Sequence, residues 1–384
     1  MRYRNLKADR LFDGETFSNA HVLVVSEEGV VEAVLPENEV QGAIETFEGI
    51  LMPGMLNCHC HLELSHMKGV IPSGTGLVPF LISVVTKRGE NEGEKFKKIR
   101  AAEQELFQNG IVAVADICNT ADAIDAKKNS SIHWYNLIEV LNLRDANLQT
   151  ALTSYGTVLQ QHLDAGLEAV LTPHAPYTIS EATFKEINAR TAGKVISVHN
   201  CETRAEEELF KWGTGDFLKL FQLFGYDASP FAVSGKSSLQ TWLPYFTNGQ
   251  TILLVHNTFI SEADIVFAKA HAEQYNLQLI YCLCPNANIY IENQLPPVDL
   301  FLKHGCHIVL GTDSYSSNWQ LSIASEIKTL KNNFPQLPLE LLLKWATGNA
   351  ATLWGFEKVG AFQAGSKPGI VLLNENDFSV QRLI

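Results

Sequence analysis

The stretch Thr251-Ile-Leu-Leu-Val-His256, together with the amphipathic segment over residues 261–275, decides the fold of this chain. The first part is a short apolar run, which predicts a β-strand covered on both faces. The second part opens Ser-Glu-Ala-Asp, a sequence typical of a helix N-terminus. A strand, a polar loop and a helix in this order form the repeating unit of α/β proteins.

Working outward from this unit, the same pattern recurs from residue 49 onward. Runs rich in Val, Ile and Leu predict eight parallel strands, over residues 49–55, 111–117, 132–140, 169–172, 195–199, 251–256, 277–282 and 307–312. Helical segments separate them, among them residues 95–109, 180–192, 203–223 and 261–275. Eight strand–helix units predict a (β/α)₈ barrel of the TIM type.

The two chain ends differ from this pattern. Residues 1–50 consist of short strand-like runs and turns, and residues 360–384 return to the same composition. We expect both ends to form one small β-domain. The predicted domains are therefore 1–50 plus 358–384 for the β-domain and 51–357 for the barrel.

Composition restricts the partners of the protein. The net charge of −13 is spread over 384 residues, which argues against binding nucleic-acid polymers or anionic membranes and leaves a small-molecule substrate. No apolar run approaches the ~20 residues that span a bilayer. The seven cysteines are an odd number, and two pairs alternate within apolar runs, so we expect reduced thiols and a cytoplasmic protein.

Polar residues that could bind one metal ion follow several of these runs. His59 and His61 alternate along the chain, so on a strand both face one side and supply half of a four-coordinate shell. His199 and Asp313 each stand at or just beyond another predicted strand end, and such ends meet at one mouth of a barrel. We predict one divalent ion, zinc with Fe²⁺ as the alternative. Asp313 as a helix cap is the other interpretation.

Three further residues lie at the predicted mouth. Glu202 is either a solvated loop carboxylate or a general acid/base. His256 is either a fourth nitrogen ligand or a group outside the shell that binds a developing oxyanion. His174, in a loop stiffened by prolines, is a candidate substrate contact.

The loops around these strand ends hold two more candidates for substrate binding. Glu63 either bonds loop amides or accepts hydrogen bonds from sugar hydroxyls or an amino group. Trp319, with Tyr315, either packs in the core or stacks on a planar base.

Ordered motifs give the chain a family resemblance over nearly its whole length. It resembles the amidohydrolase superfamily, in the branch that contains the cytosine, guanine, chlorotriazine and adenosyl-homocysteine deaminases. The motifs are Pro53-Gly-Met-Leu-Asn-Cys-His-Cys-His61, His174-Ala-Pro-Tyr-Thr178, His199-Asn-Cys-Glu-Thr203, Leu254-Val-His256, Cys284-Pro-Asn-Ala-Asn288, Leu310-Gly-Thr-Asp-Ser314, and the closing segments 346–355 and 365–373.

This resemblance implies roles for the candidate residues. His59, His61, His199 and Asp313 would bind one metal, and Glu202, His256 and Asp313 would be catalytic. Relatives with two metals carry a Lys on the fourth strand, and this chain has His174 near that place instead.

A finer resemblance points to a substrate. His61-Leu-Glu-Leu-Ser65 and Gly213-Thr-Gly-Asp-Phe217 look most like aminodeoxyfutalosine deaminases. They imply hydrolytic deamination of a 6-aminopurine nucleoside-like substrate. Dimers are common in this branch, so a homodimer is a further expectation. Two alternatives stay open. The same site could hydrolyse a C–Cl, guanidino or amide C–N bond, or the barrel could be a structural module, although such proteins typically lose metal ligands.

Overall fold

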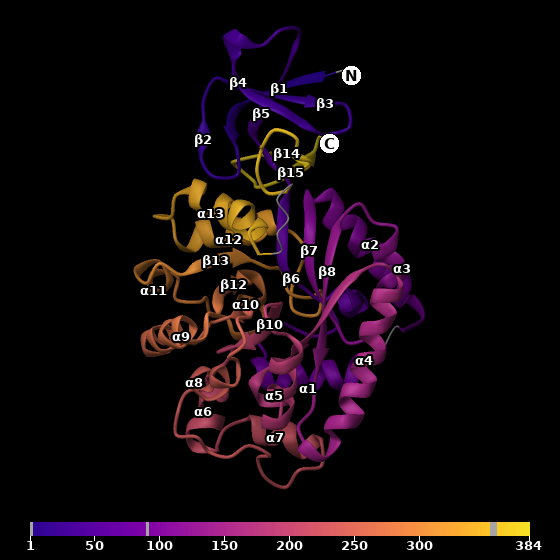
Figure 1. Ribbon diagram of the computed structural model, residues 1–384, viewed down its shortest axis with the longest axis vertical. Coiled ribbons are helices and arrows are strands. Elements are labelled where there is room, and N and C mark those ends of the chain that lie inside the picture. The colour runs from indigo at the N-terminus through magenta and orange to yellow at the C-terminus, as the bar shows by residue number, and fades with distance from the viewer. Residues whose placement is uncertain (1–2, 90–91, 354–358) are drawn as a thin grey trace.

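The structure is a computed structural model that describes residues 3–89, 92–353 and 359–384. Figure 1 shows a β-sheet with both chain ends at the top of the molecule and a larger body of strands and helices below it. The predicted boundary at residues 357/358 and the end of the closing motif at 354–355 lie outside the described residues. Within the described ranges, no helix has the length and apolar character needed to cross a membrane.

Both chain ends contribute strands to one seven-stranded sheet. Its order is β15-β14-β5-β1-β3-β4, with β2 paired to β1. The apolar face of this sheet is buried around Leu6, Leu11 and Leu23. The strands are β1 (Tyr3–Phe12), β2 (Phe17–Ser18), β3 (His21–Ser26), β4 (Val31–Pro36), β5 (Ile44–Pro53), β14 (Ile370–Leu373) and β15 (Val380–Arg382).

The body contains two four-stranded parallel sheets. One holds β6 (Met55–Cys60), β7 (Ile111–Cys118), β8 (His133–Val140) and β9 (Glu168–Pro173). The other holds β10 (Val195–Asn200), β11 (Thr251–His256), β12 (Gln278–Leu283) and β13 (His307–Leu310). The sheets adjoin at both sides, because β6 contacts β13 and β9 contacts β10. An α/β fold with parallel sheets, as predicted, is confirmed.

Helices cover these sheets, and the ends of several match the sequence signals. Helix α9 begins with a capping box in which Ser261 and Asp264 bond each other's backbone N–H groups. The helices are α1 (Leu77–Lys87), α2 (Lys95–Gln108), α3 (Ile124–Lys128), α4 (Leu148–Asp164), α5 (Glu181–Arg190), α6 (Arg204–Trp212), α7 (Phe217–Leu223), α8 (Ser238–Trp242), α9 (Glu262–Tyr275), α10 (Pro285–Glu292), α11 (Val298–Lys303), α12 (Ile323–Asn333), α13 (Leu339–Ala346) and α14 (Gly348–Ala351).

Two predicted elements are wrong, both because of glycine. The residues 49–55 do not form one strand. Residues 49–53 are the end of β5 and residue 55 begins β6, because the chain passes from one sheet to the other at Gly54. A Cβ at Gly54 would lie 2.2 Å from a methyl of Val112 and 2.9 Å from the Pro368 carbonyl oxygen, so this crossing requires glycine. The helix predicted over residues 203–223 is two helices, α6 and α7. Gly213 ends α6 with φ +69°, in the left-handed conformation of a helix C-terminus.

Candidate metal and catalytic centre

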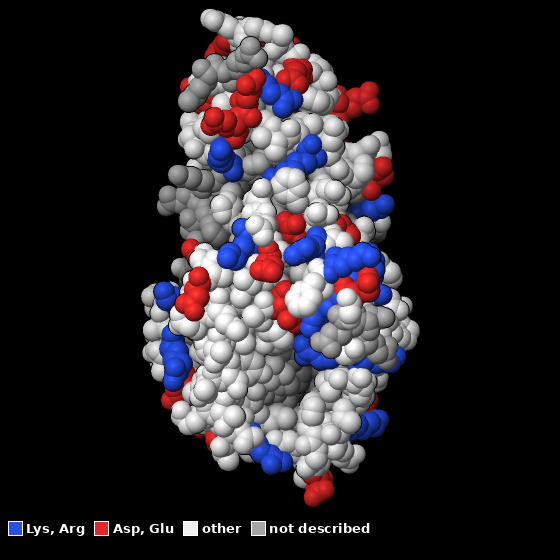
Figure 2. Space-filling model, turned by 90° about the vertical axis from the view of Figure 1, so that its right-hand side faces the viewer, with Lys and Arg blue, Asp and Glu red and all other residues white. Residues whose placement is uncertain are grey.

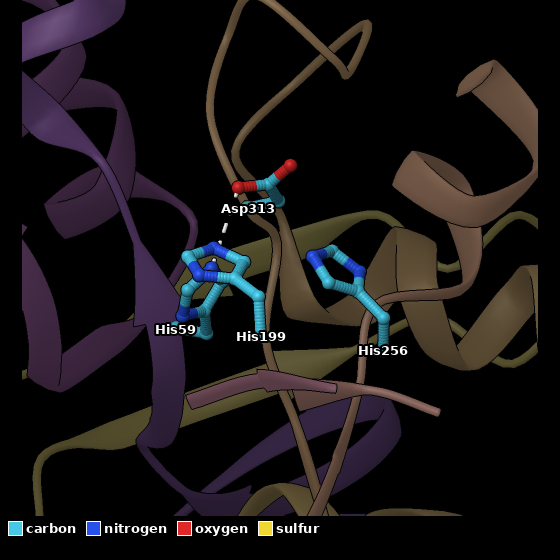
Figure 3. A group of neighbouring side chains, drawn as sticks. All are labelled: His59, His199, His256 and Asp313. Carbon is cyan, nitrogen blue, oxygen red and sulfur yellow. Dashed lines mark ion pairs between the residues drawn. The ribbon is translucent and has the colours of Figure 1, made fainter. Parts of the chain in front are cut away.

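The predicted ligands come together where the parallel strands end. His59 lies near the end of β6, His199 near the end of β10, His256 is the last residue of β11, and Asp313 follows β13. Figure 3 shows three of the imidazole rings and the Asp313 carboxylate facing a common space. The two sheets are joined here, because the backbone N–H of Asp313 donates to the His59 carbonyl over 2.9 Å.

Three of the side chains are spaced as ligands of one ion. The distance from His61 Nε2 is 3.2 Å to His59 Nε2 and 3.2 Å to Asp313 Oδ1, and from His59 Nε2 to Asp313 Oδ1 it is 3.4 Å. Zinc–nitrogen bonds of about 2.05 Å place neighbouring ligands of a tetrahedral site about 3.3 Å apart. The three atoms therefore fit one tetrahedral ion without rearrangement.

Two further histidines compete for the fourth position. One ligand atom each from His59, His199, His256 and Asp313 lies within 4.8 Å of the others. His199 donates through Nδ1 to the His174 carbonyl over 2.9 Å, which directs its Nε2 lone pair to the site. His256 Nδ1 is 3.0 Å from Asn288 Oδ1, and its Nε2 lies 3.5 Å from Glu202 Oε1. The structure thus brings His256 as close as the predicted ligands, and it alone of the four faces Glu202.

Burial keeps these rings in the form that binds metal. It lowers the pKa of His59 and His199, and it lowers the pKa of His61 and of His174 to about 3. Burial alone would raise the pKa of Asp313, but the neighbouring His59, His61 and His256 hold it well below its usual range. Neutral imidazoles beside an ionised carboxylate are the protonation states that a divalent cation requires.

The backbone is strained at the same place. His256, Asn257 and Asp313 have φ values of +69°, +58° and +58°, in the left-handed region that residues with a side chain rarely adopt. Such conformations persist where surrounding contacts impose them, and they concentrate at functional sites.

Glu202 lies beside this cluster and is buried. Its side chain is 8% exposed and accepts a hydrogen bond from the Tyr177 hydroxyl over 3.3 Å. Burial raises the pKa of Glu202 to about 7. A carboxyl group with this pKa both takes and returns a proton at neutral pH.

The centre forms the floor of a cavity of about 610 Å³. His61, His174, His199, Glu202 and Asp313 are among its polar lining, whereas α1 and α7 contribute mostly apolar side chains. In Figure 2 the lower half of the face is hollowed and largely uncharged, and positive and negative side chains mingle in a band above it.

The other predicted substrate contacts divide into two groups. His174 lines the cavity, with Nδ1 2.7 Å from the Thr178 hydroxyl. Glu63 lies behind the wall, where it accepts hydrogen bonds from the backbone N–H groups of Asn119 and Thr120 over 3.1 and 3.0 Å. Trp319 is 51% exposed and its ring contacts Tyr290. As far as the described residues form the wall, it is built without Glu63 and Trp319.

Sequence reasoning missed Glu139, another carboxylate on the cavity wall. It is 2% exposed, and burial raises its pKa to about 8. Its Oε1 lies 3.5 Å from His199 Nδ1. One signal was available in the sequence, since Glu139 is the only carboxylate within the apolar run over residues 132–140.

Comparison with known proteins gives this architecture a class. Residues 50–384 match the amidohydrolase family, and the chain belongs to it. The protein is therefore a hydrolase that acts on carbon–nitrogen bonds, and the family resemblance seen in the motifs is confirmed.

Individual relatives narrow the comparison further. The chain is 27% identical over 291 residues to an aminodeoxyfutalosine deaminase of Nitratiruptor sp.. The aligned region covers 73% of this chain and 67% of that protein. It is 25% identical over 346 residues to a 5'-deoxyadenosine deaminase of Methanopyrus kandleri, covering 85% of this chain and 73% of that protein.

Solved structures share the fold. The Helicobacter pylori aminofutalosine deaminase in complex with methylthio-coformycin superposes with a TM-score of 0.82 at 21% identity, over 97% of this chain and 93% of that one. An adenosine deaminase from Xanthomonas campestris with bound zinc gives a TM-score of 0.74 at 20% identity, over 97% and 85% of the two chains.

Proposed function

We propose that this enzyme hydrolytically deaminates a 6-aminopurine nucleoside-like substrate, aminodeoxyfutalosine or a close relative, and releases ammonia. The observation that carries the proposal is the position of Glu202, a buried carboxyl group beside a cluster of buried histidines and one carboxylate on the floor of a cavity. The names of the relatives support the same reaction, since they are deaminases of adenosine-like compounds.

The proposed metal site holds one divalent ion, zinc with Fe²⁺ as the alternative, bound by His59, His61, His199 and Asp313. The three spacings of 3.2 to 3.4 Å among the first two histidines and Asp313 support this set. When bound, a divalent ion makes hydroxide available at neutral pH by lowering the pKa of water. His256 is left outside the shell in this assignment, because its Nε2 faces Glu202.

The side chains of this centre would divide the proton transfers. Glu202 takes the proton of the attacking water and delivers it to the ring nitrogen beside the reacting carbon. Asp313 takes the second water proton from the new C–OH group, through the oxygen that the Ser317 hydroxyl contacts, and delivers it to the amino nitrogen. The C–N bond then breaks, the 6-oxo group forms, and the nitrogen leaves as ammonia. The hydrogen bond from His256 Nδ1 to Asn288 Oδ1 fixes the ring with Nε2 toward Glu202, and His256 would stabilise the new oxygen.

The shape of the cavity suits a nucleoside with an extended substituent. His174 lies beside the polar floor, where a planar base would sit, and the apolar outer wall of Leu77, Phe80 and Leu220 would cover the rest of the substrate. A cavity of about 610 Å³ falls in the range of small-molecule sites.

We also propose how the domains are divided. The contacts of β6 with β13 and of β9 with β10 support closure of the two parallel sheets into one eight-stranded (β/α)₈ barrel over residues 51–357. The seven-stranded sheet would be the composite domain of residues 1–50 plus 358–384.

The proposal also includes a location in the cell and an oligomeric state. The seven cysteines are all free thiols, six of them buried, which supports a cytoplasmic location. A homodimer follows from the family branch, and sedimentation of the purified protein tests it.

Release of ammonia by the metal-loaded protein tests the function. We expect turnover of aminodeoxyfutalosine, adenosine, thiomethyl-adenosine or adenosyl-homocysteine, with 6-oxo products, and weaker turnover of guanine and cytosine. A clear preference for guanine or cytosine would overturn the nucleoside assignment. Release of chloride or an amine from other heterocycles, without ammonia from any of these compounds, would overturn deamination.

A further inference from the structure

Glu139 is among the residues that line the cavity, and one of its two carboxylate oxygens is buried without a hydrogen-bond partner among the described residues. We propose that this oxygen binds a sugar hydroxyl of the substrate, so that Glu139 forms a hydroxyl-binding subsite next to the metal centre. The inference rests on the proposed function, because it assigns the part of the nucleoside that this wall would hold.

The two carboxylate oxygens of Glu139 have different surroundings. Oε2 accepts a hydrogen bond from the side-chain amide of Asn119 over 3.0 Å. Oε1 is buried and has no hydrogen-bond partner among the described residues. A buried acceptor without a donor is unfavourable, and such groups in folded proteins are rare enough to need an explanation.

The nearest protein donor is already engaged. His199 Nδ1 lies 3.5 Å from Glu139 Oε1, but the same nitrogen is 2.9 Å from the His174 carbonyl oxygen and carries only one hydrogen. Glu139 is also among the residues that line the cavity. Oε1 itself is buried, so a donor on a bound molecule would reach it after a small rotation of the Glu139 side chain.

The chemistry of the substrate class identifies this donor. The ring nitrogens N1, N3 and N7 of a 6-aminopurine are acceptors, and the amino group is attached to the reacting carbon. The hydroxyls of the sugar are then the donors that remain for a carboxylate. Burial raises the pKa of Glu139 to about 8, and a hydroxyl donor would favour the ionised form, because its hydrogen bond to a carboxylate is about twice as strong as one between neutral groups.

The surrounding network fixes Glu139 in place before a ligand arrives. Asn119 donates through its side chain to the carboxylate and, over 3.2 Å, to the carbonyl of Glu139. Glu63 in turn holds the loop of Asn119, since it accepts the backbone N–H groups of Asn119 and Thr120. Arg88 lies 3.5 Å from the other oxygen of Glu63. Glu63 is thus a positioning residue for the subsite, which accounts for a buried carboxylate away from the cavity.

A crossed comparison of variants and substrates tests the subsite. Wild type and Glu139→Gln are each assayed with the preferred nucleoside and with its 2'-deoxy and 3'-deoxy analogues. In wild type, removal of the bound hydroxyl should lower kcat/KM on the order of 10–100-fold. In Glu139→Gln the parent nucleoside should lose a similar factor, and the same deoxy analogue should lose little more.

Matched controls separate this role from others. Glu168→Gln makes the same chemical change at an exposed position at the start of β9 and should leave every ratio unchanged. Asn119→Ala keeps the carboxylate but removes its fixed donor, so it should weaken hydroxyl discrimination in the same sense by a smaller factor.

The outcomes that overturn the inference are distinct from a failed deaminase assay. An equal loss for parent and deoxy substrates in Glu139→Gln, or a loss of bound metal in that variant, would mean that Glu139 acts through His199 and binds no hydroxyl. Calorimetric binding of inosine and its 2'-deoxy and 3'-deoxy analogues gives a readout without turnover. Hydroxyl-dependent binding that Glu139→Gln abolishes supports the subsite even if no nucleoside is deaminated, whereas absence of hydroxyl dependence in wild type refutes it.

Discussion

The two parallel sheets each supply ligands to the same centre, yet their interiors are built differently. The sheet β6–β9 buries charge, because Asp116 on β7 pairs with Lys127 of α3 over 2.5 Å, with both side chains 0% exposed. The sheet β10–β13 is mostly apolar along its strands, and Leu253, Ile280 and Val309 lie in one cluster that also takes in Leu56 and Val112 of the other sheet. Its functional groups are confined to the ends of the strands and the loops beyond them.

This difference shows two ways to hold a ligand. Asp116 also accepts the backbone N–H of Leu62 over 2.8 Å, so the buried pair fixes the chain directly after His61. On the other sheet, close packing of apolar side chains positions the strands, and His199 and His256 are held at the mouth by the His174 carbonyl and by Asn288. Charged groups inside one sheet and apolar packing inside the other therefore hold the same centre.

Removing a ligand from either sheet should have the largest effect, because both sheets contribute to one ion. We expect His61→Ala and Asp313→Ala each to lose bound metal and to lower kcat by more than ~10²-fold. This loss exceeds the ~10–100-fold effect typical of mutating a residue that only hydrogen-bonds to a metal ligand. Elemental analysis and ammonia release measure the two quantities. Two ions per chain in wild type, or full metal content in either variant, would contradict the shared one-metal site.

Removing the acid/base should affect chemistry alone. Glu202→Gln keeps the shape of the side chain but cannot carry the proton, so kcat should fall by ~10²–10⁴-fold while bound metal persists. His256→Ala should give a similar separation, and if it loses metal instead, His256 is a ligand. A near-normal kcat for Glu202→Gln would remove it from the mechanism.

The buried pair of the sheet β6–β9 should dominate stability. Lys127→Met leaves Asp116 as an uncompensated buried charge and should lower the free energy of unfolding by about 3–5 kcal/mol. The matched change on the other sheet, Ile280→Val, removes one buried methyl group and should lower it by about 0.5–1.5 kcal/mol. Urea unfolding of the metal-loaded proteins measures both. Equal losses of the free energy of unfolding would mean that the buried ion pair contributes no more to stability than apolar packing does.

The smallest effect is expected at Trp319. Its ring is half exposed and lies outside the described cavity wall, so Trp319→Ala should change the free energy of unfolding by within about 0.5 kcal/mol and leave kcat/KM unchanged. A large rise in KM would show that this loop closes over the substrate.

The comparison of the sheets also explains how much the sequence reveals. His199, His256 and Asp313 stand at the ends of uninterrupted apolar runs. Each run predicts a buried parallel strand, and the end of the run predicts that its polar residue lies at the mouth. Glu139 stands inside such a run on β8, where burial hides its role until its neighbours are known. The break at Gly54 could not be predicted either, because the contact that requires glycine comes from Pro368, far along the chain.

Glu63 illustrates a different limit. Its position two residues after His61 is compatible with a side chain that faces either the substrate or the loop. Only the three-dimensional contacts with Asn119 and Thr120 distinguish these orientations. Sequence spacing fixes which strand a residue follows, but after the strand ends it no longer fixes the direction of the side chain.

The pairing of β5 has a consequence for synthesis on the ribosome. β5 lies between β1 and β14, and through Gly54 it leads directly into β6, which carries His59. Until residues 370–373 have been translated, one edge of β5 lacks its partner and is open to pairing with other chains. The strand that leads into the proposed metal centre is thus completed by a segment that is made long after it. A nascent chain that stalls before this segment would expose an aggregation-prone edge, even with all of the proposed metal ligands already present.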